Sequence, residues 1–191
     1  FTPDEIWHRV QRFSKLGEEE AREEFELRND VRDWKVSLAQ SDLRSKPLSK
    51  DRVKPILYRP FDTRFIYYTG KNKGFIGQPA AAIMSHMIDG KNVGLMTTRK
   101  VEVGTFGHAI CSRDMTESHS VSLKEVNYLF PLWLYPDGED LAFSKEKRPN
   151  FTPQFLRSFA KSLGIHPTGP HSLPTGLTPE DIFHYAYAVF H

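Results

Sequence analysis

The chain of 191 residues is 39% hydrophobic and 13% aromatic, a composition that supplies a packed core and excludes wholesale disorder. Its one cysteine, Cys111, excludes an internal disulfide framework and favours a reducing compartment such as the cytoplasm. No stretch approaches the roughly 18 uninterrupted apolar residues of a membrane-spanning helix, and the formal net charge is only +2.

Helices are expected toward both ends of the chain. Three segments open with threonine and proline, at residues 2–13, 152–164 and 178–190, because threonine caps a helix and proline suits its first turn. Residues 17–27 form an acidic run typical of a solvated helix, and residues 30–45 predict an amphipathic helix. Its inward face is predicted to consist of Val31, Trp34, Leu38 and Leu43.

The centre of the chain changes to strand patterns. Aromatic and β-branched runs punctuated by Gly, Pro, Asp and Asn predict strands within residues 56–69, 92–100, 104–112 and 127–136. A short helix is predicted within residues 78–90, and its inward residues are expected to be Ile83, Met84, Met87 and Ile88. A Gly/Pro-rich connector is predicted from Ser162 to Thr178. The expected fold is α+β, with a strand-rich, mixed or antiparallel central sheet flanked by N-terminal and C-terminal helices.

Charge is distributed unevenly along the chain. Residues 1–43 carry 7 Lys or Arg and 11 Asp or Glu, a balance of −4. Residues 44–100 carry 12 and 3, a balance of +9, and residues 101–191 carry 7 and 10, a balance of −3. Such segregation is typical of a nucleic-acid-binding surface. The alternative is a lysine-rich face that is simply solvated.

The basic segment contains the candidate DNA contacts. In YRPFDTRFIYYTGKNKGFIGQP, residues 58–79, cations and amides surround aromatic strand residues. Lys and Arg neutralise phosphates, whereas Arg, Asn, Gln and Thr also suit base edges. The candidate DNA-binding residues are Arg59, Arg64, Lys71, Asn72, Lys73, Gln78, Thr98, Arg99 and Lys100. The residues expected to pack the strand are Phe61, Phe65, Ile66, Tyr67 and Tyr68.

The arginines also have structural interpretations. A turn at RPFD would let Asp62 pair with Arg59 or Arg64 and order the turn without touching a ligand. Arg99 is expected at the edge of the domain, where a buried strand ends and its planar fork can match a guanine. The alternative for Arg99 is a surface ion pair with Glu102, which would contribute little.

No catalytic or metal-binding residues are assigned. The glycine-rich turns that hold nucleotides or S-adenosylmethionine are absent from the sequence. His108 and Cys111 form only one weak ligand pair, and Cys111 is expected to be a small hydrophobic residue on a strand.

Several blocks of sequence, in this order, carry a family resemblance: LYRPFDTRFIYY, GFIGQPAAAIMSHMI, NVGLMTTRKV, NYLFPLWLYP, KRPNFTPQFL and TPEDIFHYAYAVFH. The chain resembles the C-terminal specificity region of type ISP and related type IIG-like, single-chain restriction–modification DNA adenine methyltransferases. The resemblance covers nearly the whole chain. It implies that residues 1–191 are one DNA target recognition domain, and that loops and strand ends are better candidates for base contacts than the shared RPFD block.

The resemblance also implies what lies outside this chain. The expected parent is a longer polypeptide, in agreement with a start without methionine and an end inside an apolar helical pattern. The expected partners are double-stranded DNA and an N6-adenine methyltransferase domain of the same polypeptide, with no membrane partner. No cofactor is expected in this region, whereas S-adenosylmethionine, with Mg and ATP in full restriction enzymes, is expected in the parent.

Two alternative functions stay open from the sequence. One is a non-specific nucleic-acid clamp that uses stacked aromatic side chains. The other is a protein–protein module whose basic face binds an acidic partner.

Overall fold

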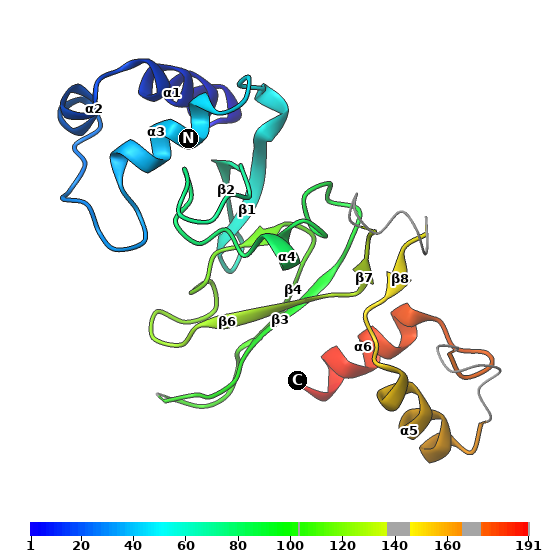
Figure 1. Ribbon diagram of the computed structural model, residues 1–191. Helices are drawn as coiled ribbons and strands as arrows, with labels where there is room; N and C mark the ends of the chain where they lie inside the picture. Colours follow the sequence, from blue (N-terminus) through cyan, green and yellow to red (C-terminus); the bar gives the residue numbers. More distant parts are fainter. Residues whose placement is uncertain (103, 137–145, 166–172, 191) are drawn as a thin grey trace. The chain divides into compact units, whose positions relative to one another are not determined.

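The computed structural model divides into two compact units, each of which contains helices and small sheets (Figure 1). The first unit is residues 1–88 with 114–117, and the second is residues 89–113 with 118–191. The residues that the structure describes are 1–102, 104–136, 146–165 and 173–190. This arrangement confirms the α+β class. Residues 166–172 of the predicted connector lie outside the described residues.

The first unit begins with helices and continues into a hairpin. Its elements are α1 (Pro3–Lys15), α2 (Glu18–Glu24), α3 (Val36–Arg44), the 3-10 turn η1 (Lys50–Arg52), β1 (Val53–Arg59), β2 (Asp62–Tyr67), α4 (Ala81–Met84) and β5 (Met115–Thr116). As predicted, Thr2 caps α1: its hydroxyl accepts a hydrogen bond from the backbone of Glu5, and the Glu5 carboxylate accepts one from the backbone of Thr2.

The sheet of the first unit has the order β2-β1-β5. β1 and β2 form an antiparallel hairpin in which Arg59 is opposite Asp62, and β5 joins β1 in parallel. Tyr67 at the end of β2 is almost fully buried and packs with the helices. The buried core of this unit consists of Val10, Phe13, Leu16, Ala21, Val36, Ala39, Leu43 and Tyr67.

Two predicted helices are shorter than expected. α3 begins only at Val36, because residues 31 and 34 close a small antiparallel bridge and the Asp30 carboxylate accepts a hydrogen bond from the Val36 backbone. The predicted inward residue Val31 therefore lies before the helix and is exposed; Leu38 lies within α3 but is exposed because the buried side of that helix carries Val36, Ala39 and Leu43. α4 is a single turn without a side-chain cap; Met87 is buried as expected, but Ile83 is exposed.

The second unit combines a three-stranded sheet with two C-terminal helices. Its elements are β3 (Gly94–Thr98), β4 (Ala109–Ser112), β6 (Asn127–Pro131), β7 (Trp133–Leu134), β8 (Arg148–Pro149), α5 (Pro153–Leu163) and α6 (Pro179–Val189). The threonine caps predicted for both helices are present, since Thr152 and Thr178 accept hydrogen bonds from first-turn backbone groups.

Strand β3 is the centre of the second unit. It pairs antiparallel with β4 on one side and with β6 on the other, while β7 and β8 form a separate ribbon. Leu95, Leu132 and Phe183 form the buried cluster that joins β3 to α6. Side chains alternate along β6, so that Tyr128 and Phe130 are exposed whereas Leu129 is buried. Throughout the described parts of the chain, every helix is too short or too polar to cross a membrane.

Candidate nucleic-acid interface

The nine candidate DNA-binding residues fall into three local groups. The hairpin β1–β2 carries Arg59 and Arg64, and the loop that follows it carries Lys71, Asn72, Lys73 and Gln78 in the same unit. The end of β3 in the second unit carries Thr98, Arg99 and Lys100.

The two hairpin arginines stack on one tyrosine. The guanidinium carbon of Arg59 lies 4.1 Å from the centre of the Tyr58 ring, and that of Arg64 lies 3.7 Å from it. Because an aromatic face attracts a cation, Tyr58 holds both side chains against the hairpin.

Each of these arginines also has a carboxylate partner. Arg64 pairs with Asp62 at 2.8 Å, and Arg59 pairs with Glu117 at 3.0 Å. The hydrogen bond from Arg64 holds the pKa of Asp62 below its ordinary value, so that Asp62 is charged at neutral pH. The predicted pairing of Asp62 at the RPFD turn is therefore present, with Arg64 as the partner.

The predicted packing role of Phe61 is wrong. Phe61 occupies the tip of the hairpin, its relative exposure is 103%, and its φ of 64° is in the left-handed region. Tyr67 is buried as expected, and Phe65, Ile66 and Tyr68 are half-buried. Phe61 is exposed because the strands end at Arg59 and Asp62, so that it belongs to the turn and not to either strand.

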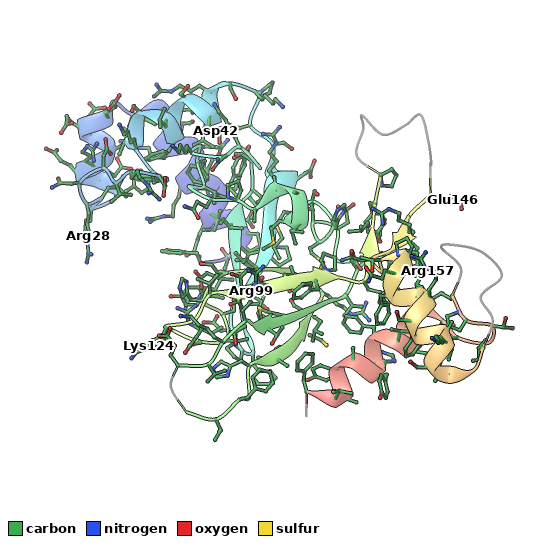
Figure 2. The ribbon with its side chains drawn as sticks, turned by 60° about the horizontal axis from the view of Figure 1, so that its bottom comes forward. Arg28, Asp42, Arg99, Lys124, Glu146 and Arg157 are labelled. Atoms are coloured by element: carbon green, nitrogen blue, oxygen red, sulfur yellow. The ribbon has the colours of Figure 1, made fainter. Side chains whose placement is uncertain are left out.

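A buried carboxylate holds the basic loop that follows the hairpin. Asp42, labelled in Figure 2, is 6% exposed and extends from α3. Its Oδ2 accepts hydrogen bonds from the Thr69 hydroxyl at 2.6 Å and from the Phe75 backbone at 2.8 Å. Gly74 lies so close that a β-carbon there would be 2.7 Å from the Asp42 Cγ. Two ends of the loop are thus fixed on one side chain.

Between these ends, the loop presents its cations to solvent. Lys71, Asn72 and Lys73 are all exposed, and the Lys73 backbone bonds to the Gly77 carbonyl at 2.9 Å. The indole of Trp34 donates to the Phe75 carbonyl at 3.0 Å and anchors the same loop. Side chains at residues 71–73 are therefore displayed from an ordered backbone, which lowers the entropic cost of a phosphate contact.

Gln78 has a protein partner in this structure. Its amide donates to the Asp33 carboxylate at 3.0 Å, and Asp33 also pairs with Arg32. This hydrogen bond connects the end of the loop to the segment before α3.

In the second unit, Arg99 stacks on an aromatic ring and Lys100 forms an ion pair with Glu102. The guanidinium carbon of Arg99 lies 4.3 Å from the centre of the Tyr128 ring (Arg99 is labelled in Figure 2). The surface ion pair considered for Arg99 with Glu102 is instead formed by Lys100. Arg99 remains exposed at the end of β3, where the sequence placed it.

The segment after Arg99 is anchored by a buried glutamate. The backbone of Glu102 donates to the Glu125 carboxylate at 2.8 Å, and the Ser122 hydroxyl donates to the same group. The Ser122 hydrogen bond is the main reason that the pKa of Glu125 is lowered. By contrast, the hydroxyl of Thr98 is buried, and within the described residues it has no hydrogen-bond partner.

Metal ligands are not gathered in the described ranges: no three His, Cys, Asp or Glu side chains there could hold an ion together. Cys111 is half-buried on β4, and burial raises the pKa of its thiol, which disfavours the reactive thiolate.

Sequence reasoning did not single out Asp42 or Tyr128. Both act on residues far away in the sequence: Asp42 is 27 residues from Thr69, and Tyr128 lies on a different strand from Arg99. A single acid in a helix and a single aromatic in an alternating strand carry no local signal for these contacts.

Comparison with known protein families gives one match over the whole chain. The description of the matching family is "Type ISP C-terminal specificity domain", and the match covers residues 1–191. No curated protein sequence matches the chain.

Two solved structures are similar over most of the chain. The cryo-electron microscopy structure of a DrdV–DNA complex is 24% identical with a TM-score of 0.56, and the alignment covers 97% of this chain and 16% of the DrdV chain. A nuclease-deletion mutant of the type ISP restriction–modification enzyme LlaGI, in complex with a DNA substrate mimic, is 13% identical with a TM-score of 0.41 over 83% of this chain and 15% of that chain. The likeness to DrdV supports the fold, and the family match over all 191 residues decides the classification. The chain belongs to the family of type ISP C-terminal specificity domains.

Proposed function

We propose that this chain recognises a specific sequence of double-stranded DNA for a restriction–modification enzyme. The observation that carries the proposal is the match to a specificity-domain family over all 191 residues. The geometry adds two exposed cationic sites with ordered supports, the loop at residues 71–73 and the end of β3. Residues 1–191 would act as one recognition module, although they fold as two units.

The exposed groups divide into two roles. Lys71, Asn72 and Lys73 supply exposed N–H donors in a loop bounded by glycines, which suits contacts to backbone phosphates. Arg99 suits a base edge, because its guanidinium is planar and its contact with the Tyr128 ring restricts the orientation of that plane. Lys100 adds charge beside it.

The remaining candidates would contribute less directly. Arg59 and Arg64 are already paired and stacked, so their first role is to order the hairpin, with their outer N–H groups available to phosphates. Gln78 and Thr98 would need to leave the arrangement seen here, Gln78 by releasing Asp33 and Thr98 by exposing its hydroxyl.

Chemistry would take place elsewhere in a longer polypeptide. The chain spans 16% of the length of DrdV. We propose that the parent carries an N6-adenine methyltransferase domain that uses S-adenosylmethionine, flips the adenine and methylates it, with Mg and ATP required if the parent also cleaves. Such an enzyme would act on DNA in the cytoplasm.

The test is selection from a pool of randomised duplexes, followed by sequencing of the bound fraction at two salt concentrations. Recognition predicts one enriched motif and an affinity that falls with salt. Salt-dependent binding without a motif, or tighter binding to single strands, would indicate the non-specific clamp instead. A folded chain that ignores every duplex would contradict DNA recognition and favour the protein-docking module.

A further inference from the structure

The tip of the β1–β2 hairpin exposes a phenylalanine in a backbone conformation that phenylalanine disfavours. Proline fixes φ near −65° at Pro60, and the φ of 64° at Phe61 then matches the pattern of a type II turn. That second turn position is ordinarily Gly or Asn, because a side chain with a β-carbon is strained there. Phe61 gains no burial in compensation, since it is 103% exposed. Folding alone does not explain a phenylalanine at this position.

The hairpin under this ring is held rigidly. The guanidinium groups of Arg59 and Arg64 both pack on the Tyr58 ring, at 4.1 and 3.7 Å from its centre. The Arg64–Asp62 and Arg59–Glu117 ion pairs hold both sides of the turn, the second of them to the segment that follows β5. The backbone that carries Phe61 therefore has a fixed position, so that the exposed ring is presented from the tip of the hairpin.

The surroundings of the ring decide which ligand it fits. A protein-docking site has a core of several apolar side chains from which charged residues are depleted. Phe61 is instead the one exposed aromatic side chain of the hairpin tip: its neighbours in the chain are exposed Pro60 and the charged Arg59, Asp62 and Arg64, and Thr63 is polar and exposed. One rigid apolar side chain flanked by arginines is the composition of the wedges that proteins insert between base pairs while cations contact the neighbouring phosphates.

We propose that Phe61 is an apolar wedge that inserts between adjacent base pairs of the bound duplex and unstacks them. This inference rests on the proposed DNA recognition and adds to it a distortion of the DNA; an inserted ring reads no base identity, so a wedge in the shared RPFD block does not make that block a determinant of specificity. The strained turn is retained because it aims the ring away from the hairpin. Arg59 and Arg64 accompany the ring and face the phosphates on either side of the opened step.

The turn geometry provides variants that separate folding from binding. Phe61→Gly and Phe61→Asn remove the ring and suit a positive φ, so the melting temperature should stay the same or rise by a few degrees. Phe61→Leu keeps an apolar wedge. Val189→Gln, at a position on α6 that is 68% exposed, is the control for the loss of an exposed apolar side chain in general.

The measurement uses the 191-residue chain and duplexes that it binds, with 2-aminopurine placed at successive positions. The unaltered chain should raise the fluorescence at one step, where the probe is unstacked. Phe61→Gly and Phe61→Asn should abolish this rise and weaken binding by about tenfold, the scale expected when insertion energy is lost. Phe61→Leu should keep part of both effects, and Val189→Gln should keep all of them.

The failures are distinguishable. Salt-dependent duplex binding without a fluorescence rise at any position overturns the wedge and leaves DNA recognition standing. A fluorescence rise that persists in Phe61→Asn also overturns the wedge. A clear fall in the melting temperature of Phe61→Gly and Phe61→Asn overturns it too, because the ring would then have a packing role. If the unaltered chain binds no duplex, the proposed function itself fails and the wedge fails with it.

Discussion

The guanidinium carbon of Arg99 lies 4.3 Å from the centre of the Tyr128 ring, so that a cation at the end of β3 is stacked on an exposed aromatic of β6. Stacking uses the face of the guanidinium and leaves the N–H groups at its edge for other acceptors. A base-reading arginine needs this property, because a guanine is recognised by two coplanar N–H groups.

Replacement of Arg99 should therefore change specificity more than stability. Arg99→Ala is expected to lose about 1–3 kcal/mol of discrimination at one base position, with an almost unchanged melting temperature because the side chain is exposed. Sequencing of selected duplexes measures the loss. Arg157→Ala, at an exposed position of α5, is the matched control for the loss of an exposed arginine. The same selected motif for Arg99→Ala and the unaltered chain would end the case for Arg99.

Tyr128 should act through Arg99. Tyr128→Leu removes the ring and is expected to cost roughly 0.5–1 kcal/mol at the base position that Arg99 reads, whereas Tyr128→Phe keeps the aromatic face and should behave as the unaltered chain. In the Arg99→Ala background, Tyr128→Leu should add little, because the contact is already gone. Additive effects in this double-mutant cycle would show that Tyr128 works independently of Arg99.

The basic loop should contribute affinity without sequence preference. Lys71→Ala and Lys73→Asn are each expected to weaken binding to all duplexes and to lower the salt slope by about one unit per phosphate contact. Asparagine is chosen at position 73 because the φ of 52° there disfavours most other side chains. Lys161→Ala on α5 serves as the control. A changed motif with an unchanged salt slope would mean that these lysines read bases.

The Asp42 clamp should couple loop order to DNA affinity. In Gly74→Ala, the new methyl group would collide with the Asp42 carboxylate and approach the Lys71 carbonyl at 3.1 Å, so the loop must shift. Asp42→Asn weakens hydrogen bonds to Thr69 and Phe75, which should destabilise the unit by about 1–3 kcal/mol. Both variants should lose affinity for all duplexes. Gly107→Ala, with nothing within 4 Å of the added carbon, should leave melting and binding unchanged.

Acid should destabilise the helix caps. Hydrogen bonds from the Thr2 backbone and hydroxyl lower the pKa of Glu5, and those from the Thr178 hydroxyl and backbone lower the pKa of Asp181. A lowered folded-state pKa means that this stabilisation is complete above the ordinary carboxylate range, about 4, and is lost as the pH falls below it. Thermal melts from neutral to acid pH measure the effect. Glu5→Gln and Asp181→Asn should have lower melting temperatures at neutral pH, and these temperatures should fall less with acid. If the melting temperature of both variants falls with pH as steeply as that of the unaltered chain, the caps are not the source of the acid sensitivity.

The sequence by itself determined the features that depend on residues close together in the chain. Thr2, Thr152 and Thr178 predicted their helices because a cap is formed with the backbone two or three residues away. Local composition likewise predicted two further features. These are the turn between Arg59 and Asp62 and the strand that ends before Arg99. The family resemblance could also be found from the sequence, because it rests on short blocks of neighbouring residues that occur in order along nearly the whole chain.

The tertiary structure alone decided which side chains meet. Gln78 stays a candidate for a base contact, and the structure adds that its amide donates to Asp33, 45 residues earlier. The ion pair with Glu102 that was considered for Arg99 is formed by Lys100, whereas Arg99 packs on the Tyr128 ring of the neighbouring strand. Phe61 is a large apolar residue and was expected to be packed, but its position in the turn exposes it. Local periodicity specifies the backbone of an element, whereas the partner of a polar or aromatic side chain depends on which distant segments the folded core brings within a few ångströms.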